Sequence, residues 1–331
     1  MEKITIKKLA EELNLSTSTV SRALSDNYQI SRVTKASIVK YAEQRGYRVN
    51  LFARSLREGK TRTIGLIVCS LDKAFMNQVL SAIYSYWHEK GYKLLVLQSG
   101  GECQAELNCI TSLLDLGIDG LLISPSFPGG NFPYLNELIS KGLPIVIFDR
   151  VDLRINTCQI ASDNILAGEM AADYILSRKL NKILLIGGKD GFLSQERIKG
   201  FLTKMNSNGG TSHSPVYFDL EAPDMLFTDL FLFFSKGIQH SDFAAVFTTN
   251  DTLTLMVLRV FKKLGIQVPV IGFCNSELSD LLQGQPKTIV QPSSEIGQLA
   301  SEKLYAAIKY RTVPEKEMLF LPATIIGRTF S

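Results

Sequence analysis

A chain of 331 residues is longer than a single hydrophobic core usually serves, so we expect two or three domains. Its 45% hydrophobic content excludes a disordered protein, and charged residues interrupt the longest apolar runs, which excludes a membrane span. The N-terminus lacks the apolar stretch of a signal peptide, and the five cysteines show no paired spacing. We therefore expect a cytoplasmic protein with reduced thiols and without cofactor, metal or membrane partner.

The net charge of +4 is divided unevenly along the chain. Residues 1–62 contain 13 Lys and Arg against 6 Asp and Glu, an excess of seven positive charges, whereas the rest contains 23 basic and 26 acidic residues. A basic N-terminal segment before a slightly acidic remainder indicates a polyanionic partner for that segment. A basic face that is merely solvated would give the same count. The charge alone therefore does not distinguish a polyanion-binding segment from an ordinary surface, and the predicted fold of the segment is needed as well.

The N-terminal segment carries the pattern of a helix-turn-helix. Apolar residues recur at helical spacing over residues 6–13, which predicts a first helix with one buried face. Asn14 tolerates the left-handed backbone of a tight turn, and Ser16 is placed to cap a second helix. A third helix is predicted from a cap at Ser31 to a stop at Gly46.

The second helix presents short hydroxyl side chains and one arginine on its outer face. Such a helix can lie close to base edges in the major groove, where Arg22 reaches guanine O6 and N7 beside Thr17 and Ser18. The residues expected to hold phosphates are Ser16, Thr19 and Ser21. A small three-helix bundle that contacts another protein is the alternative interpretation.

Three segments carry a long, ordered motif: Ile4-Thr5-Ile6, residues 15–24 (LSTSTVSRAL) and residues 46–57 (GYRVNLFARSLR). This motif resembles the headpiece and hinge of the lactose-repressor (LacI/GalR-type) family, and residues 63–68 resemble that family's first core strand. The resemblance covers essentially the whole chain and implies a transcription regulator. The further DNA contacts predicted with it are Thr5, Ser31, Thr34, Tyr47, Asn50, Ala53 and Leu56.

In that family the hinge becomes a short helix on operator DNA, and a leucine wedges between base pairs in the minor groove. The matching residue here is Leu56. An apolar wedge exchanges base stacking for a bend that brings more protein into contact. The alternative is that Leu56 is a linker residue docked on the core. Val49 departs from the family's usual proline, which leaves the entrance of the hinge less stiff.

Beyond the hinge, short β-branched segments alternate with helical ones, which is the pattern of parallel sheets in βαβ units. The predicted strands span residues 64–68, 94–97, 120–123, 145–148, 183–186, 245–247 and 270–273. Most of them end in polar or glycine-containing residues, and ligands of open parallel sheets bind at those carboxyl ends. The core is similar to periplasmic sugar-binding proteins, which implies two lobes around a cleft whose closure is the switching motion.

The predicted fold is an N-terminal all-α helix-turn-helix headpiece with a hinge helix, followed by a two-lobed α/β periplasmic-binding-protein-like core with parallel sheets. The predicted domains are the headpiece (residues 1–49), the hinge (50–61) and the effector-binding and dimerisation core (62–331). Within that core, lobe one comprises residues 62–161 and 292–321, and lobe two comprises residues 162–291 and 322–331.

The resemblance places a small-molecule effector between the lobes. Phe75 is the expected stacking wall, and Asp149 and Arg197 can each engage two neighbouring hydroxyl groups. The other predicted effector contacts are Asn250, Asn275 and Gln291. The alternative is an ion pair between Asp149 and Arg197 that bridges the lobes or caps a helix.

A sugar or sugar derivative is the expected effector, and a purine nucleobase is the second candidate because Phe75 can stack on either. Cys274 stands where many family members place an aspartate on the ligand, so the expected contacts are interrupted at that position. The residues of the sequence therefore indicate DNA binding more directly than they indicate the class of effector.

Catalytic motifs are incomplete. Gly59-Lys60-Thr61 ends like a phosphate-binding P-loop, but Arg54 stands in the place of its first glycine. Gly187-Gly188 closes a strand without the spaced third glycine of a dinucleotide site, so a tight turn is predicted there. The three histidines are widely separated and give no zinc-site spacing.

The sequence thus favours a homodimeric regulator, a repressor rather than an enzyme, that reads a pseudo-palindromic operator and responds to the effector. Two alternatives stay open. One is a small-molecule-binding module whose basic head contacts protein, and the other is a small-molecule enzyme on the same sheets.

Overall fold

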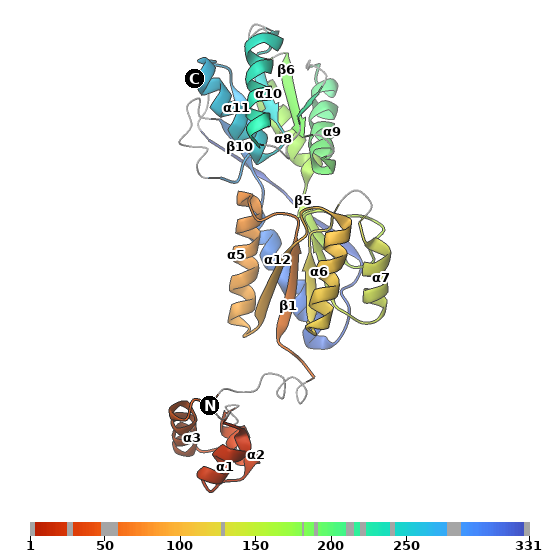
Figure 1. Ribbon diagram of the computed structural model, residues 1–331. Coiled ribbons are helices and arrows are strands. Elements are labelled where there is room, and N and C mark those ends of the chain that lie inside the picture. Colours follow the sequence, from red (N-terminus) through yellow and green to blue (C-terminus); the bar gives the residue numbers. More distant parts are fainter. Residues whose placement is uncertain are drawn as a thin grey trace. The chain divides into compact units, whose positions relative to one another are not determined.

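The computed structural model describes residues 4–24, 29–47, 59–126, 130–180, 182–188, 191–209, 215–218, 223–238, 242–276 and 286–327. The chain divides into two compact units, Met1–Thr61 and Arg62–Ser331, which are called the head and the core below (Figure 1). Three of the predicted DNA contacts, Asn50, Ala53 and Leu56, lie outside the described residues.

The head contains the three predicted helices: α1 (Ile6–Glu12), α2 (Thr17–Leu24) and α3 (Arg32–Gln44). Hydroxyl side chains cap each of them. The Oγ1 of Thr5 accepts a hydrogen bond from Lys8 N, the Oγ of Ser16 accepts from Thr19 N, and the Oγ of Ser31 accepts from Thr34 N. Asn14 takes the left-handed backbone (φ 52°), so the predicted turn between α1 and α2 is confirmed.

A small apolar cluster of Leu9, Ala10, Val20, Ala23, Ile38 and Ala42 holds the three helices together. A polar tie supplements it. The carboxylate of Glu12 on α1 accepts hydrogen bonds from Arg45 Nε (3.0 Å), Arg45 Nη2 (2.5 Å) and the Tyr41 hydroxyl (3.1 Å). Because α1 and α3 are fixed in this way, the outer face of α2 is presented on a rigid support.

The core contains two six-stranded sheets. Sheet A has the order β11-β5-β4-β3-β1-β2 and is parallel throughout. Its strands are β1 (Thr63–Val68), β2 (Lys93–Gln98), β3 (Gly120–Ile123), β4 (Ile145–Phe148), β5 (Cys158–Ser162) and β11 (Glu317–Leu321). Helices α5 (Ala74–Glu89) and α12 (Ser293–Tyr310) pack in one apolar cluster with it, and α6 (Cys103–Asp115) and α7 (Phe132–Ser140) in another. We call this part lobe A.

Sheet B has the order β12-β10-β9-β8-β6-β7, and only β12 runs antiparallel to its neighbour. Its strands are β6 (Ile183–Gly188), β7 (Val216–Phe218), β8 (Ala245–Thr248), β9 (Val270–Phe273), β10 (Lys287–Val290) and β12 (Thr324–Ile326). The helices packed with it are α8 (Asn164–Ser177), α9 (Phe192–Ser207), α10 (Pro223–Leu232), the π-helix η1 (Phe233–Gly237) and α11 (Asp251–Leu264). We call this part lobe B. The chain passes between the lobes after β5, β10 and β11.

All seven predicted strands are present, and five more were not predicted. β5, β7, β10, β11 and β12 are short or carry polar residues such as Gln159 and Thr288, which are buried by the neighbouring strands and helices. The predicted turn at Gly187-Gly188 is wrong, because both glycines belong to β6. A side chain at Gly187 would press on the Tyr217 ring of β7, so packing rather than a turn requires glycine there.

Helices α8 and α9 cross at unusually close range because each carries a glycine at the crossing. A methyl group at Gly168 would overlap the carbonyl oxygen of Arg197, and one at Gly200 would overlap the carbonyl oxygen of Ile165. The obstacles are backbone atoms, which cannot turn aside as a side chain can. The crossing therefore sets the position of α9 and of the Arg197 side chain that it carries.

Gly168→Ala is expected to lower the free energy of unfolding by about 1–3 kcal/mol, because α9 must move away from α8 to make room. Leu166→Ala in the same helix is the matched control, since Leu166 is 39% exposed and its loss should cost within about 0.5 kcal/mol. Urea unfolding of both variants measures the difference. Equal stability of the two variants would contradict the close crossing.

Candidate functional site

The N-terminal turn of α2 gathers hydroxyl groups on the surface of the head. The Oγ of Ser16 lies 2.7 Å from the Oγ of Ser18 and 2.8 Å from the Oγ1 of Thr19. Thr17 and Arg22 are exposed on the same short helix. Exposed hydroxyls at the capped start of α2 and the guanidinium of Arg22 in its last turn can donate to phosphate oxygens or base edges.

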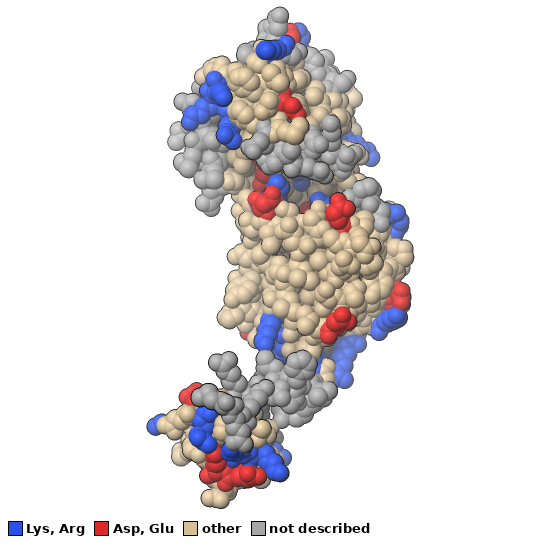
Figure 2. Space-filling model, viewed as in Figure 1, with Lys and Arg blue, Asp and Glu red and all other residues tan. Residues whose placement is uncertain are grey.

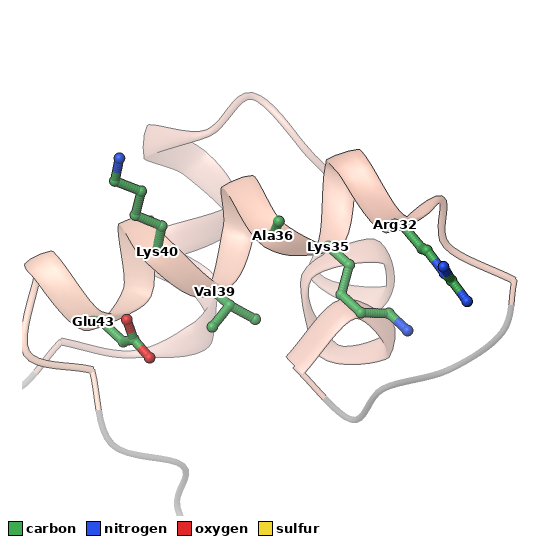
Figure 3. A pocket seen from close by; sticks show the side chains of 6 residues that line it. All are labelled: Arg32, Lys35, Ala36, Val39, Lys40 and Glu43. Atoms are coloured by element: carbon green, nitrogen blue, oxygen red, sulfur yellow. The ribbon is translucent and has the colours of Figure 1, made fainter.

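The start of α3 adds a second hydroxyl pair and a basic face. The Oγ of Ser31 lies 2.8 Å from the Oγ1 of Thr34. Along the helix, Arg32, Lys35 and Lys40 surround a shallow groove over Ala36 and Val39, with Glu43 at its far end (Figure 3). The prediction missed these cations, although their spacing of three to five residues along one helix was a readable signal.

Tyr47 has a different environment from the other predicted DNA contacts. It is half-buried, its ring packs against the apolar cluster of the head, and burial raises the pKa of its hydroxyl above the usual range. The buried part of the Tyr47 side chain therefore packs within the head. Only its exposed part can contact a partner.

In the core, Asp149 directly follows β4 and has a buried side chain. Its backbone is left-handed (φ 67°), a conformation that non-glycine residues adopt at an energetic cost. The Oγ of Ser124, which follows β3, donates to its Oδ2 at 3.2 Å. Burial raises the pKa of Asp149, and the charges of Arg150 and Arg197 oppose that rise.

Arg197 on α9 is buried in lobe B with most of its guanidinium fixed. Its Nε donates to Asn164 Oδ1 at 2.8 Å, its Nη1 donates to the carbonyl of Thr249 at 2.6 Å, and the group stacks on the Phe273 ring at 3.9 Å. Burial lowers the pKa of Arg197 to about 10. A desolvated guanidinium held this rigidly gains strongly from any further acceptor that reaches it.

Asp149 and Arg197 attract each other across the lobes without touching. Both residues are described, and no nitrogen–oxygen contact within 4.0 Å joins them, so the ion pair considered as an alternative is not formed. Asp251 at the start of α11 is also attracted to Arg197, and burial raises its pKa. Two carboxylates and one guanidinium thus face the lobe boundary, where acidic and basic side chains gather in Figure 2.

The other predicted effector contacts have structural partners. Phe75 packs in the apolar cluster of lobe A and is only 8% exposed. The Oδ1 of Asn250 accepts from Leu253 N at 2.9 Å, so this side chain caps α11. The side chain of Asn275 donates to the backbone carbonyl of Gln291 and accepts from its backbone N. The structure therefore groups Asp149 with Arg197 and gives the remaining four residues packing or bridging contacts.

Several buried polar residues, in α9 and at the ends of strands, were not predicted. Ser194 and Thr249 share a hydrogen bond of 2.9 Å beside Arg197, and Ser99 and Ser126 share one of 3.3 Å in lobe A. Ser124 and Thr249 lie in polar clusters that the sequence marks at strand ends, so the signal was present without a way to rank them. Cys274, in the place of the family's aspartate, is 1% exposed.

Glu106 is a second unpredicted group. It is fully buried on α6, and its carboxylate accepts from Ser126 N (2.5 Å) and Asn131 Nδ2 (2.8 Å). It therefore holds the segment that follows β3 in place. All five cysteines are free thiols.

Among the residues that the structure describes, no three His, Cys, Asp or Glu side chains gather as a metal site. Within the same residues, no helix is both long and apolar enough to cross a bilayer.

Comparison with known proteins supports the same architecture. Residues 64–312 match the family described as periplasmic binding protein domain. The transcriptional repressor PurR of Vibrio vulnificus is 27% identical over 332 aligned positions, covering 98% of both chains. The ribose operon repressor of Haemophilus influenzae is 26% identical over 325 positions, covering 93% of this chain and 95% of that one. Both relatives are named as repressors rather than enzymes.

Two solved structures share the fold. The Lac repressor dimer bound to operator and an anti-inducer has a TM-score of 0.84 at 20% identity, with 98% of each chain covered. Cra of Pseudomonas putida in complex with fructose 1-phosphate has a TM-score of 0.71 at 23% identity, covering 81% of this chain and 99% of that one.

A helix-turn-helix head followed by two parallel sheets with buried polar strand ends defines a DNA-binding transcription regulator with a small-molecule-sensing core. The chain belongs to the lactose-repressor (LacI/GalR-type) family, and its core is a periplasmic binding protein domain.

Asp149→Asn tests the burial of the carboxylate. Because the folded state raises the pKa of Asp149 above its ordinary 3.8, the wild type should lose stability relative to Asp149→Asn as pH rises through that raised value. Asparagine keeps an oxygen for Ser124 and cannot ionise. Urea unfolding across the acidic to neutral range measures the difference, and a difference independent of pH would contradict a buried, desolvated Asp149.

Proposed function

We propose that this protein is a homodimeric, cytoplasmic repressor without enzymatic activity. Its head reads a pseudo-palindromic operator, and binding of an effector to its core either weakens or strengthens the affinity for that operator. The observation that carries the DNA-binding half is the outer face of α2. There a capped helix exposes Thr17, Ser18 and Arg22 beside the hydroxyl pair at the start of α3. Two-fold symmetry of a dimer would require a symmetric operator.

The proposed division of labour follows the predicted boundaries. Residues 1–49 act as the headpiece, residues 50–61 as the hinge, and residues 62–331 as the sensing and dimerising core. In the hinge, Leu56 is proposed as the minor-groove wedge, with Asn50 and Ala53 as neighbouring contacts. The basic face of α3 supports the same assignment, because Arg32 and Lys35 lie next to Ser31 and Thr34, two of the predicted DNA contacts.

Selection of bound sequences from a random pool of double-stranded DNA tests the function directly. A DNA-reading dimer should enrich a pseudo-palindrome, and its affinity should fall steeply with salt because phosphate contacts release counterions. A head that docks on protein, or an enzyme on the same fold, would enrich no palindrome.

Arg22→Ala should weaken binding to the selected operator by about 1–3 kcal/mol and relax the preference at one base pair in each half-site. The physical reason is loss of a bidentate contact to a guanine edge. Lys7→Ala is the control, since Lys7 is an exposed cation on α1 outside the proposed reading face. Retained base discrimination in Arg22→Ala, measured by competition with single-base operator variants, would remove Arg22 from the readout.

The proposed effector is a sugar or sugar derivative held between Asp149 and Arg197. Carboxylates accept from hydroxyl groups and a guanidinium donates to them, so this pair of charged groups suits a ligand with several hydroxyls. The proposal keeps Phe75, Asn250 and Gln291 as the outer wall of the same site, and takes Asn275, the fourth of the other predicted contacts, as a bridge to lobe A. Ligands named in solved relatives, including fructose 1-phosphate, make sugars the first compounds to try.

A thermal-shift panel of neutral sugars, sugar phosphates and nucleobases tests the effector class, because a bound ligand raises the melting temperature by mass action. Asp149→Ala and Arg197→Ala should abolish the shift given by the best compound. Asp115→Ala, an exposed carboxylate on α6, should leave it unchanged. A wild-type response in both site variants would show that the effector binds elsewhere.

The proposed dimer face runs over α5 and the edge strand β2. Figure 2 shows few charges on lobe A over α5 and α6, and α5 contains one acidic residue, Glu89, and no Lys or Arg. Tyr84 on this helix is 56% exposed, and the apolar residues of β2 are only half-buried. Depletion of charge around exposed aromatic side chains is typical of interface centres.

Tyr84→Asp is expected to weaken self-association, because a desolvated carboxylate would have to enter the apolar interface. Met225→Asp is the control, since Met225 is 66% exposed on α10, a helix of lobe B that is not part of this face. Sedimentation equilibrium of the two variants and the wild type gives the comparison. Equal association of all three would place the dimer face elsewhere.

A further inference from the structure

The start of α5 in lobe A is hydrogen-bonded to lobe B through the side chain of Gln78. Its Nε2 donates to the carbonyl of Asn275 at 3.0 Å, and its Oε1 accepts from Asn275 Nδ2 at 2.9 Å. The Oε1 also accepts from the Oγ of Ser293 at 2.5 Å. Gln78 therefore ties α5 both to the segment after β9 and to the start of α12.

The side-chain amide of Asn275 makes all of its hydrogen bonds within the protein. Its Oδ1 accepts from Gln291 N at 3.0 Å, and its Nδ2 donates to the Gln291 carbonyl at 2.9 Å and to the Oγ of Ser293 at 3.3 Å. The residue is 5% exposed. Its amide hydrogens and oxygen are thus all engaged by protein groups, which fits a bridging role better than the effector contact that the sequence predicts.

A second contact joins the same two lobes at their rim. Lys73 Nζ, just before α5, donates to Thr252 Oγ1 of α11 at 3.1 Å and to Asp72 Oδ2 at 3.1 Å. The neighbouring Asp251 accepts from Asn275 N at 3.3 Å and is attracted to both Lys73 and Arg197. Asp251 therefore links this group of contacts to the buried guanidinium of the candidate effector site.

From these contacts we propose that Gln78 and Asn275, here called the interlobe amide pair, are positioning residues that set the angle between the lobes. The inference rests on the proposed function, because the lobe angle matters there as the switch between two DNA affinities. A hydrogen bond fails when its atoms separate by about 1 Å beyond contact distance. A rotation of lobe B against lobe A that moves the segment after β9 away from α5 by this distance therefore breaks the pair and leaves largely buried amide groups unpaired.

The pair consequently favours the lobe arrangement in which it is formed. Removing it should shift the population toward other lobe angles, and a differential of this kind changes affinity at a coupled site by roughly 5- to 150-fold. Residues that only stabilise the fold behave differently, since they lower the melting temperature without moving the balance between folded states.

Gln78→Met tests the pair, because methionine keeps the length of the side chain and its packing but removes every hydrogen bond. Gln298→Ala is the control: Gln298 is an amide on α12 whose partner, Glu302, lies in the same helix. Two measurements on the full chain apply. One is small-angle X-ray scattering of the free protein, and the other is affinity for the operator obtained by DNA selection.

We expect Gln78→Met to change the scattering profile of the free protein and to change operator affinity about tenfold or more, with salt dependence and base discrimination as in the wild type. Gln298→Ala should match the wild type in all of these. An unchanged profile and unchanged affinity in Gln78→Met, with only a lower melting temperature, would overturn the proposal. Failure to select any operator would count against the proposed function, while the scattering comparison would still decide on the amide pair.

A double-mutant cycle adds a test that a merely structural role does not pass. Because Gln78 and Asn275 act through one contact, the effects of Gln78→Met and Asn275→Ala on operator affinity should be strongly non-additive. Additive effects would mean that the two side chains act independently, and the pair as a unit would be rejected.

Discussion

The sensing core depends on the burial of one positive charge, the guanidinium of Arg197. Three separate elements of lobe B hold it: Asn164 at the start of α8, the carbonyl of Thr249 after β8, and the Phe273 ring of β9. These partners do not fully offset the cost of desolvating the guanidinium, and burial therefore lowers the pKa of Arg197. A polar ligand that supplies further acceptors would therefore gain more here than at a solvated arginine.

Lobe A supplies the opposite charge under a comparable constraint. The backbone of Asp149 is held in the left-handed region, and the hydroxyl of Ser124 donates a hydrogen bond to its carboxylate. A left-handed backbone at a non-glycine residue has an energetic cost, which the surrounding structure must offset. Since the two charges attract without contact, the energy of the site depends on the distance between lobes, and contacts such as Gln78 to Asn275 that set this distance also set the strength of the site.

The head and the β-branched strands were predictable because their signals are local. A hydroxyl cap, a left-handed Asn14 and one apolar face lie within a few residues of the helices they define. The site was less predictable, because an asparagine has the same appearance in sequence whether it caps a helix, bridges two lobes or binds a ligand. Asn250 takes the first role locally, whereas the partner of Asn275 is 197 positions away. Sequence spacing does not predict a contact between residues so far apart. The resemblance to a family indicated that position 275 matters but did not indicate which residues Asn275 contacts.

Charge counting pointed to the N-terminal segment, and the structure shows how the placement of cations there differs from their placement in the core. Several cations of the core make cation–π contacts with aromatic rings: Arg259 lies over Phe227, Lys90 over Tyr86 and Lys263 over Phe231. Such contacts direct cations onto the protein's own surface. In the head, Arg45 is bound by Glu12, whereas Arg32 and Lys40 line the exposed face of α3. Attraction to a polyanion therefore follows the placement of the cations more closely than their number, and the head combines placement with the hydroxyl-rich face that can read a base sequence.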